Sequence, residues 1–68
     1  MTQEDLNNIF SFHPPTPEKL LQYDDIRSTC RELAGLINDS CPESTEKSLA
    51  IIKLEEVMFW ANASIARN

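Results

Sequence analysis

Two arginines offer the clearest chemistry in this sequence. Arg27 and Arg31 are four residues apart, so on a helix they lie on the same side. A guanidinium binds a phosphate through two parallel hydrogen bonds, which makes the pair a candidate anion site. The spacing also allows a purely structural role, in which Arg27 pairs with Asp24, and Arg31 pairs with Asp24 or another acidic side chain.

Further candidates lie outside this pair. Phe12 and His13 precede two prolines, which hold the chain extended in a rigid elbow. Phe12 either stacks on a base, as aromatics do in nucleotide sites, or fills the packing of the fold. Arg67 either complements the negative end of a helix or projects toward a phosphate. Lys47 is disfavoured by the dipole in the first turn of a helix, so it is either merely tolerated there or part of an anion pocket.

No catalytic or metal-binding pattern is convincing. Ser11, His13 and Asp24 or Asp25 contain the residue types of a catalytic triad, but nothing in their spacing fixes the geometry that such a triad requires. One histidine and two cysteines, without CxxC or HxxxH spacing, disfavour a zinc site. Cys30 and Cys41 are too far apart along the chain for a disulfide unless it doubles back at once. We expect a protein that is not an enzyme and has no cofactor.

The charge balance narrows the range of partners. The formal net charge of −5 at pH 7 argues against general binding to DNA, RNA or an anionic membrane, which requires an excess of Lys and Arg. A small anion held in a local basic pocket remains compatible with it. The sequence has neither a signal peptide pattern nor an apolar run of about 20 residues that would span a membrane. We expect a soluble, reduced, cytoplasmic protein.

The sequence predicts an all-α fold in a single domain, residues 1–68. One Gly and four Pro in 68 residues leave long stretches for helices. The N-terminal arm, 1–15, contains a short helix that begins after Thr2. A helix over 16–38 begins at Thr16 and Pro17, and a second long helix over 44–67 begins at Ser44. The short turn between these two long helices predicts an antiparallel hairpin.

The apolar pattern predicts how the hairpin packs. Helix 16–38 carries one stripe: Tyr23, Ile26, Cys30, Leu33, Ala34 and Ile37. Helix 44–67 carries a matching stripe: Ala50, Leu54, Val57, Met58, Ala61 and Ile65. Its opposite side carries a second stripe: Leu49, Ile52, Phe59, Trp60 and Ala63. A helix that is apolar on two faces is buried on two faces, so the second stripe needs a second copy of the chain or an N-terminal arm folded back over Trp60.

Several segments together resemble a phage helical-hairpin domain. They are FHP at 12–14, YDDIR at 23–27, CPESTEKSLA at 41–50, KLE at 53–55 and WANASIARN at 60–68. The domain occurs in anti-CBASS cyclic-oligonucleotide sponges and is shared with a Thoeris anti-defence sponge. The resemblance covers about residues 10–68.

The resemblance implies a specific function. It implies a homohexamer in the cytoplasm of an infected bacterium, which sequesters cyclic dinucleotides and trinucleotides before they activate CBASS effectors. Family members use pockets between protomers, and the resemblance matches Phe12 to an aromatic position and Arg27 to a basic one. Thr29 and Arg67 are further matches. His13 and Arg31 join the candidates because His13 lies next to Phe12 and Arg31 lies one helical turn from Arg27. The alternative is a protein-interaction module that docks a host helix on the Phe59 and Trp60 face.

Overall fold

The chain forms three helices, and each begins at a side chain that caps it. The computed structural model describes residues 1–68 and contains α1 (Gln3–Phe10), α2 (Pro17–Ser40) and α3 (Thr45–Arg67), with no strands. The hydroxyl groups of Thr2, Thr16 and Ser44 accept hydrogen bonds from backbone N–H groups three residues later. Such N-caps satisfy donors that the first turn of a helix leaves free. An all-α chain with a helical hairpin is therefore what the structure shows.

The first helix is fixed by a reciprocal cap. The Asp5 carboxylate accepts a hydrogen bond from the Thr2 backbone N–H at 2.9 Å, and the Asp5 N–H donates to the Thr2 hydroxyl at 3.1 Å. The hydrogen bond from the Thr2 backbone, followed by that of the Thr2 side chain, lowers the pKa of Asp5 from its ordinary value. This capping box begins a helix of only eight residues, which is too short to be stable alone.

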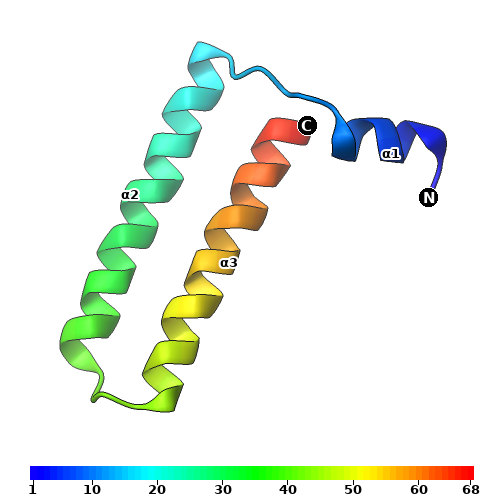
Figure 1. Ribbon diagram of the computed structural model, residues 1–68. Helices are drawn as coiled ribbons and strands as arrows, with labels where there is room; N and C mark the ends of the chain where they lie inside the picture. The colour runs from blue at the N-terminus through cyan, green and yellow to red at the C-terminus, as the bar shows by residue number, and fades with distance from the viewer.

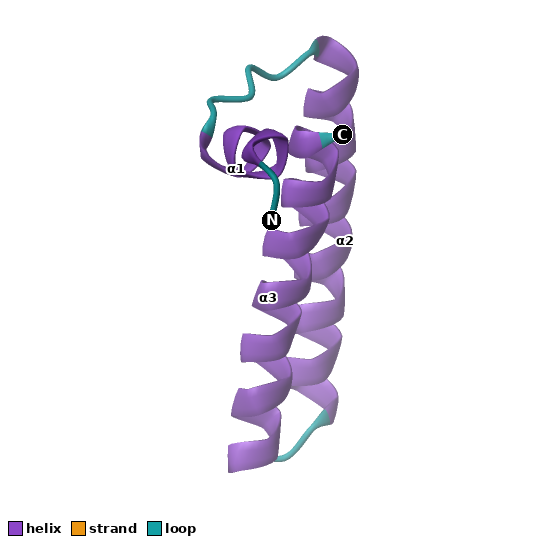
Figure 2. Ribbon diagram, turned by 90° about the vertical axis from the view of Figure 1, so that its right-hand side faces the viewer, coloured by secondary structure: helices purple, strands orange, loops and turns teal.

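The two long helices lie side by side and antiparallel, and α1 lies apart from them. Figure 1 shows α1 beside the C-terminal end of α3, on the side away from α2. Figure 2 shows α1 almost end-on, so its axis lies across the direction of the hairpin. The molecule measures 46 × 29 × 12 Å. The hairpin is thus a single layer of two helices with two broad faces. None of the three helices is long and apolar enough to cross a membrane.

The seam between α2 and α3 is only half buried. On α2 it follows Tyr23, Ile26, Cys30, Ala34 and Ile37, and on α3 it follows Ile51, Leu54, Met58, Ala61 and Ile65. No hydrophobic residue of the chain is fully buried. A protomer without a buried core has little to offset the entropy lost on folding.

The predicted stripes are wrong in part, because the seam is rotated on α3. Ala50 is exposed and Val57 is 58% exposed, while Ile51 faces α2 in their place. Lys47 sets this rotation: it reaches across to the end of α2, and Ile51 follows it one turn later on the same side. Leu33 of α2 is likewise 45% exposed and flanks the seam.

Two other sequence-based expectations differ from the structure. The helix expected over 16–38 ends two residues later, at Ser40, because the Cys41 N–H still donates to the Ile37 carbonyl in the helical pattern. The arm folded back over Trp60 is wrong as well. The arm lies at the end of α3, where it lines a hollow with Arg67 and Asn68, and Trp60 stays 69% exposed.

Candidate functional site

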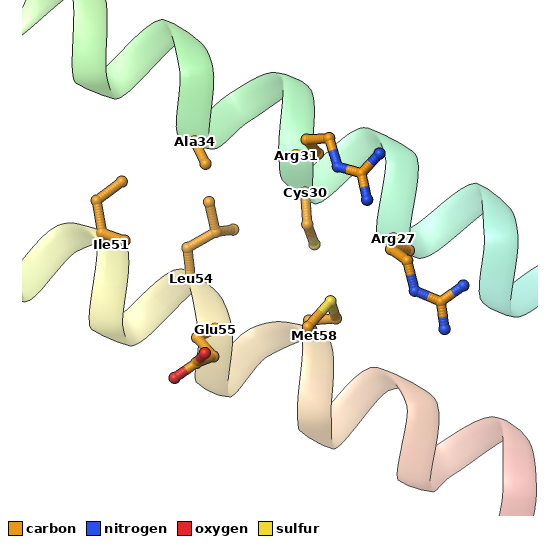
Figure 3. Close-up of a pocket in the computed structure, with 8 residues that line it drawn as sticks. All are labelled: Arg27, Cys30, Arg31, Ala34, Ile51, Leu54, Glu55 and Met58. Atoms are coloured by element: carbon orange, nitrogen blue, oxygen red, sulfur yellow. The ribbon is translucent and has the colours of Figure 1, made fainter.

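A groove between the two long helices contains both candidate arginines. It has a volume of about 310 Å³ and is lined by Arg27, Cys30, Arg31, Ala34, Ile51, Leu54, Glu55 and Met58. Figure 3 shows Cys30 and Met58 turned toward each other across the seam, with the two arginines on α2 and Glu55 on α3. We call this the arginine groove. An apolar floor with a few polar groups along its rim is the usual composition of a small-molecule site.

The two arginines of the groove differ in their pairing. The Arg27 Nη1 donates to the Asp24 Oδ1 at 3.1 Å, and the two side chains are 51% and 72% exposed. An ion pair this exposed is worth about 0–1 kcal/mol, so an incoming phosphate can replace Asp24 at little cost. Arg31 forms no ion pair or side-chain hydrogen bond within the chain. The structure therefore contains the ion pair considered for Arg27, with Asp24, and no ion pair of Arg31 with an acidic side chain.

A second hollow lies where α1 meets the end of α3. It is lined by Glu4, Asp5, Asn7, Asn8, Ser11, Phe12, His13, Arg67 and Asn68, and we call it the tip hollow. Phe12 is 85% exposed. The His13 Nε2 lies 2.5 Å from the Asn8 carbonyl oxygen; because a carbonyl only accepts, this nitrogen carries the proton and donates. His13 thereby satisfies the end of α1 and fixes the elbow next to Phe12.

Thr29 lies away from both hollows. It is exposed and lines neither of them. Two residues along a helix correspond to a rotation of about 200° at 3.6 residues per turn, so Thr29 points to the opposite broad face from Arg27 and Arg31. The six candidate residues thus fall into three places on one protomer: the arginine groove, the tip hollow and the opposite face.

Lys47 does not belong to an anion pocket. It is the one buried residue of the chain, at 8% exposure, and its Nζ donates to the Asn38 carbonyl at 2.8 Å and to Glu43 Oε1. A cation at the C-terminal end of α2 complements the negative end of that helix dipole. Lys47 therefore closes the turn of the hairpin, and both sequence-based interpretations, the merely tolerated cation and the anion pocket, miss this role.

Comparison with known protein families gives the family. The family model described as Acb2/Tad1, hairpin domain, matches residues 2–66. The chain belongs to this family. The match includes the N-terminal arm and nearly the whole hairpin, and it assigns the chain to the anti-CBASS and anti-Thoeris sponges. No curated protein and no solved structure matches the chain.

Membership of the Acb2/Tad1 hairpin family indicates the general role of this protein. The family implies a phage anti-defence sponge. A sponge acts by holding a molecule rather than converting it, which favours a binding protein over an enzyme. The structure contains no group of three or more His, Cys, Asp or Glu side chains placed to hold a metal ion.

Two residues escaped the sequence-based reasoning. Glu55 is not among the predicted site residues but lies on the rim of the arginine groove. Its position in the sequence, next to the apolar Leu54, was a usable signal. The Asn62 Oδ1 is buried and has no hydrogen-bond partner. A polar residue one turn after Met58 on the seam side of α3 was the corresponding signal. The negative charge of Glu55 disfavours an anion in the groove. The Asn62 Oδ1 can still accept a hydrogen bond.

Proposed function

We propose that the protein binds cyclic dinucleotides and cyclic trinucleotides and thereby keeps them from CBASS effectors. A homohexamer in the cytoplasm of the infected host would perform this sequestration. The observation that carries the proposal is an exposed pair of arginines on one rim of an apolar groove, in a family of anti-defence sponges. The chain is otherwise acidic, with a net charge of −5. Two arginines on one rim, of which Arg31 has no ion pair, therefore give it a local site for an anion.

The chemistry of a cyclic oligonucleotide suits the side chains present. It has two or three phosphodiesters, each with one negative charge, and bases with exposed aromatic faces. Arg27 and Arg31 supply bidentate donors for the phosphates, and Phe12 supplies a stacking face. Arg67, Thr29 and His13 are the remaining proposed contacts, with His13 holding the elbow that presents Phe12.

Self-assembly is the step that brings these groups together. One protomer keeps Phe12 in the tip hollow, Arg27 in the arginine groove and Thr29 on the opposite face. A symmetric oligomer places different parts of identical chains next to one another and so forms sites that no single chain contains. Exposed apolar side chains on both long helices support such an assembly; they include Leu20, Leu36, Ile52, Val57, Phe59 and Trp60.

Calorimetry on the assembled protein tests the binding. A panel of cyclic dinucleotides, cyclic trinucleotides and the cyclic ADP-ribose signals of Thoeris systems would be titrated, with linear dinucleotides as matched controls. We expect a saturating heat with at least one cyclic ligand and none with its linear form. Absence of heat across the whole panel would contradict the proposal.

A second function has one specific observation in its favour. Phe59 and Trp60 are 57% and 69% exposed and share a hollow with Ile52 and Ala63, a surface on which the helix of a host protein can dock. Native mass spectrometry separates the two functions. A monomer that binds no nucleotide favours docking of a host protein, and an oligomer favours the sponge.

A further inference from the structure

The two long helices begin with nearly the same four residues. The sequence is TPEK at 16–19 and STEK at 44–47, a shift of 28 positions. In both, the hydroxyl of the first residue accepts a hydrogen bond from the lysine N–H, at 3.2 Å for Lys19 and 3.1 Å for Lys47. The same shift pairs four seam residues of α2 with four of α3: Tyr23 with Ile51, Ile26 with Leu54, Cys30 with Met58, and Ile37 with Ile65. The hairpin is thus an approximate internal repeat.

The repeat includes what the two lysine side chains bind. Lys47 Nζ donates to the Asn38 carbonyl, near the C-terminal end of α2, at 2.8 Å. Lys19 Nζ donates to the Ala66 carbonyl, near the C-terminal end of α3, at 3.5 Å. Asn38 and Ala66 are related by the same shift as the two lysines. Each lysine therefore places its charge at the negative end of the neighbouring helix.

The two lysines differ in what surrounds them. Lys47 is 8% exposed and has a second partner, the Glu43 carboxylate. The position that corresponds to Glu43 is Pro15, which has no charged group. Lys19 is only half buried and has one hydrogen bond, which is long. Such a bond contributes less to stability than the bonds of Lys47, so stability alone does not account for the role of Lys19.

The Lys19 bond attaches the last turn of α3 to the rest of the chain. Carbonyl groups in the last turn of a helix have no partner within the helix, and helix ends fray where nothing holds them. The Asn68 Nδ2 donates to the Ser64 carbonyl at 3.1 Å, but both residues belong to this same end. The bond from Lys19 to Ala66 is the one hydrogen bond that joins this turn to another helix.

This turn carries Arg67, whose side chain forms no ion pair within the chain. Arg67 lines both the tip hollow and the hollow that contains Phe59 and Trp60. We propose that Lys19 is a positioning residue of the binding site: it holds the Ala66 carbonyl and thereby fixes the turn from which Arg67 reaches the ligand. The inference rests on the proposed function, in which Arg67 contacts the cyclic nucleotide, and it names a residue that acts through Arg67.

A turn that is fixed in advance favours binding because less has to be ordered when the ligand arrives. Ordering one flexible side chain on binding corresponds to about a twofold to tenfold loss of affinity. Lys19→Met keeps the apolar stem of the side chain and removes the ammonium. We therefore expect this variant to bind the ligand about two to ten times more weakly than the wild type.

A double-mutant cycle tests whether Lys19 acts through Arg67. The wild type, Lys19→Met, Arg67→Ala and the double variant would be titrated calorimetrically with the cyclic dinucleotide or trinucleotide that the wild type binds most tightly. Lys19→Met should weaken binding in the wild-type background and have no further effect once Arg67 is alanine. A direct contact of Lys19 with the ligand, or a loss of charge alone, would weaken binding equally in both backgrounds and would overturn the inference.

Three further variants separate positioning from general stability. Lys19→Arg keeps a charged donor and should retain most of the wild-type affinity. Lys53→Met removes one positive charge at an exposed position and should leave the affinity unchanged. Lys47→Met should lower the midpoint of thermal unfolding more than Lys19→Met does. If Lys19→Met lowered the midpoint as much as Lys47→Met while its affinity stayed unchanged, Lys19 would be structural and the inference would fail.

Hydrogen exchange of residues 64–68 in the protein without ligand tests the same link independently of binding. Lys19→Met should reduce the protection of these amides, and Lys53→Met should not. A wild type that binds no cyclic nucleotide, with protection that still depends on Lys19, contradicts the proposed function and leaves the link from Lys19 to Arg67 standing. A wild type that binds, with a Lys19→Met variant of unchanged affinity and protection, contradicts the inference and leaves the function standing.

Discussion

The two ends of the hairpin differ in how firmly the chain closes them. At the turn, Lys47 is 8% exposed and bonds both the last turn of α2 and Glu43, so its charge is satisfied within one chain. At the other end a longer hydrogen bond, from Lys19 Nζ to the Ala66 carbonyl at 3.5 Å, joins α2 to α3. Phe12 and Trp60 stay 85% and 69% exposed there, and the elbow is held by the His13 hydrogen bond. The closed end supplies stability, and the open end keeps its apolar and basic groups available. An acidic chain of this size therefore separates the residues that hold it from the residues that we propose to bind.

The largest effect is expected at Arg27, in the arginine groove. Arg27→Ala should weaken cyclic nucleotide binding by about ten- to a hundredfold, because a hydrogen bond to a charged group contributes about 1.5–3 kcal/mol. The helix content should stay as in the wild type, since the pair with Asp24 is exposed. Calorimetry measures the affinity. Asp24→Asn is the matched control: it frees Arg27 without removing it, so affinity should hold or rise, and a loss in this variant would contradict the assignment.

The next largest effect is expected at the turn of the hairpin, which Lys47 closes. Lys47→Met keeps the apolar stem of the side chain and removes the ammonium, which leaves the Asn38 carbonyl without its donor. Thermal unfolding followed by circular dichroism should show a loss of about 1–3 kcal/mol. Lys53→Met is the control, because Lys53 is 68% exposed in a weak pair. Equal losses in the two variants would mean that the turn does not close through Lys47.

A similar or smaller effect is expected at the elbow. Phe12→Ala should weaken nucleotide binding, since base–aromatic stacking is worth about 1–3 kcal/mol, and it should leave unfolding unchanged because Phe12 is 85% exposed. Phe12→Tyr keeps the aromatic face and should keep the affinity. If Phe12→Ala lowered the stability instead, Phe12 would belong to the packing of the fold and the comparison between the two ends would fail.

The smallest effect concerns α1. The Thr2 backbone lowers the pKa of Asp5, so the capping box stabilises α1 fully above the ordinary Asp pKa of 3.8. This contribution is lost as the pH falls through the lower, folded-state value. Chemical shifts of residues 3–10 should therefore move toward coil at acidic pH in the wild type. Asp5→Asn should remove most of that pH dependence, and an unchanged titration would show that the box does not hold α1.

Local signals made the helices predictable. Thr16 with Pro17 and Ser44 mark where the long helices begin, because N-capping depends only on residues within one turn. The rotation of the seam was not predictable in this way. It follows from the reach of Lys47 to Asn38 across the turn, and the 3.6-residue period alone cannot choose between Ala50 and Ile51 as the residue that faces α2.

The candidate site was predictable only where one helix sets it. The four-residue spacing of Arg27 and Arg31 places them on one side of α2, and the structure puts both on one groove. The approach of Arg67 to Phe12 and His13 depends on where an extended linker leads α1, and no periodicity in the sequence encodes that. The separation of Thr29 from Arg27 was implicit in their spacing and directs attention to sites formed between chains.

The most direct test of the account is an effector release assay. A CBASS effector would be activated with a limiting amount of its cyclic oligonucleotide in the presence of excess protein, and the mixture would then be heated to denature the sponge before fresh effector is added. We predict a silent effector before heating and full activity afterwards, because the ligand is held and not cleaved. An effector that stays active from the start, or activity that does not return after heating, would contradict sequestration.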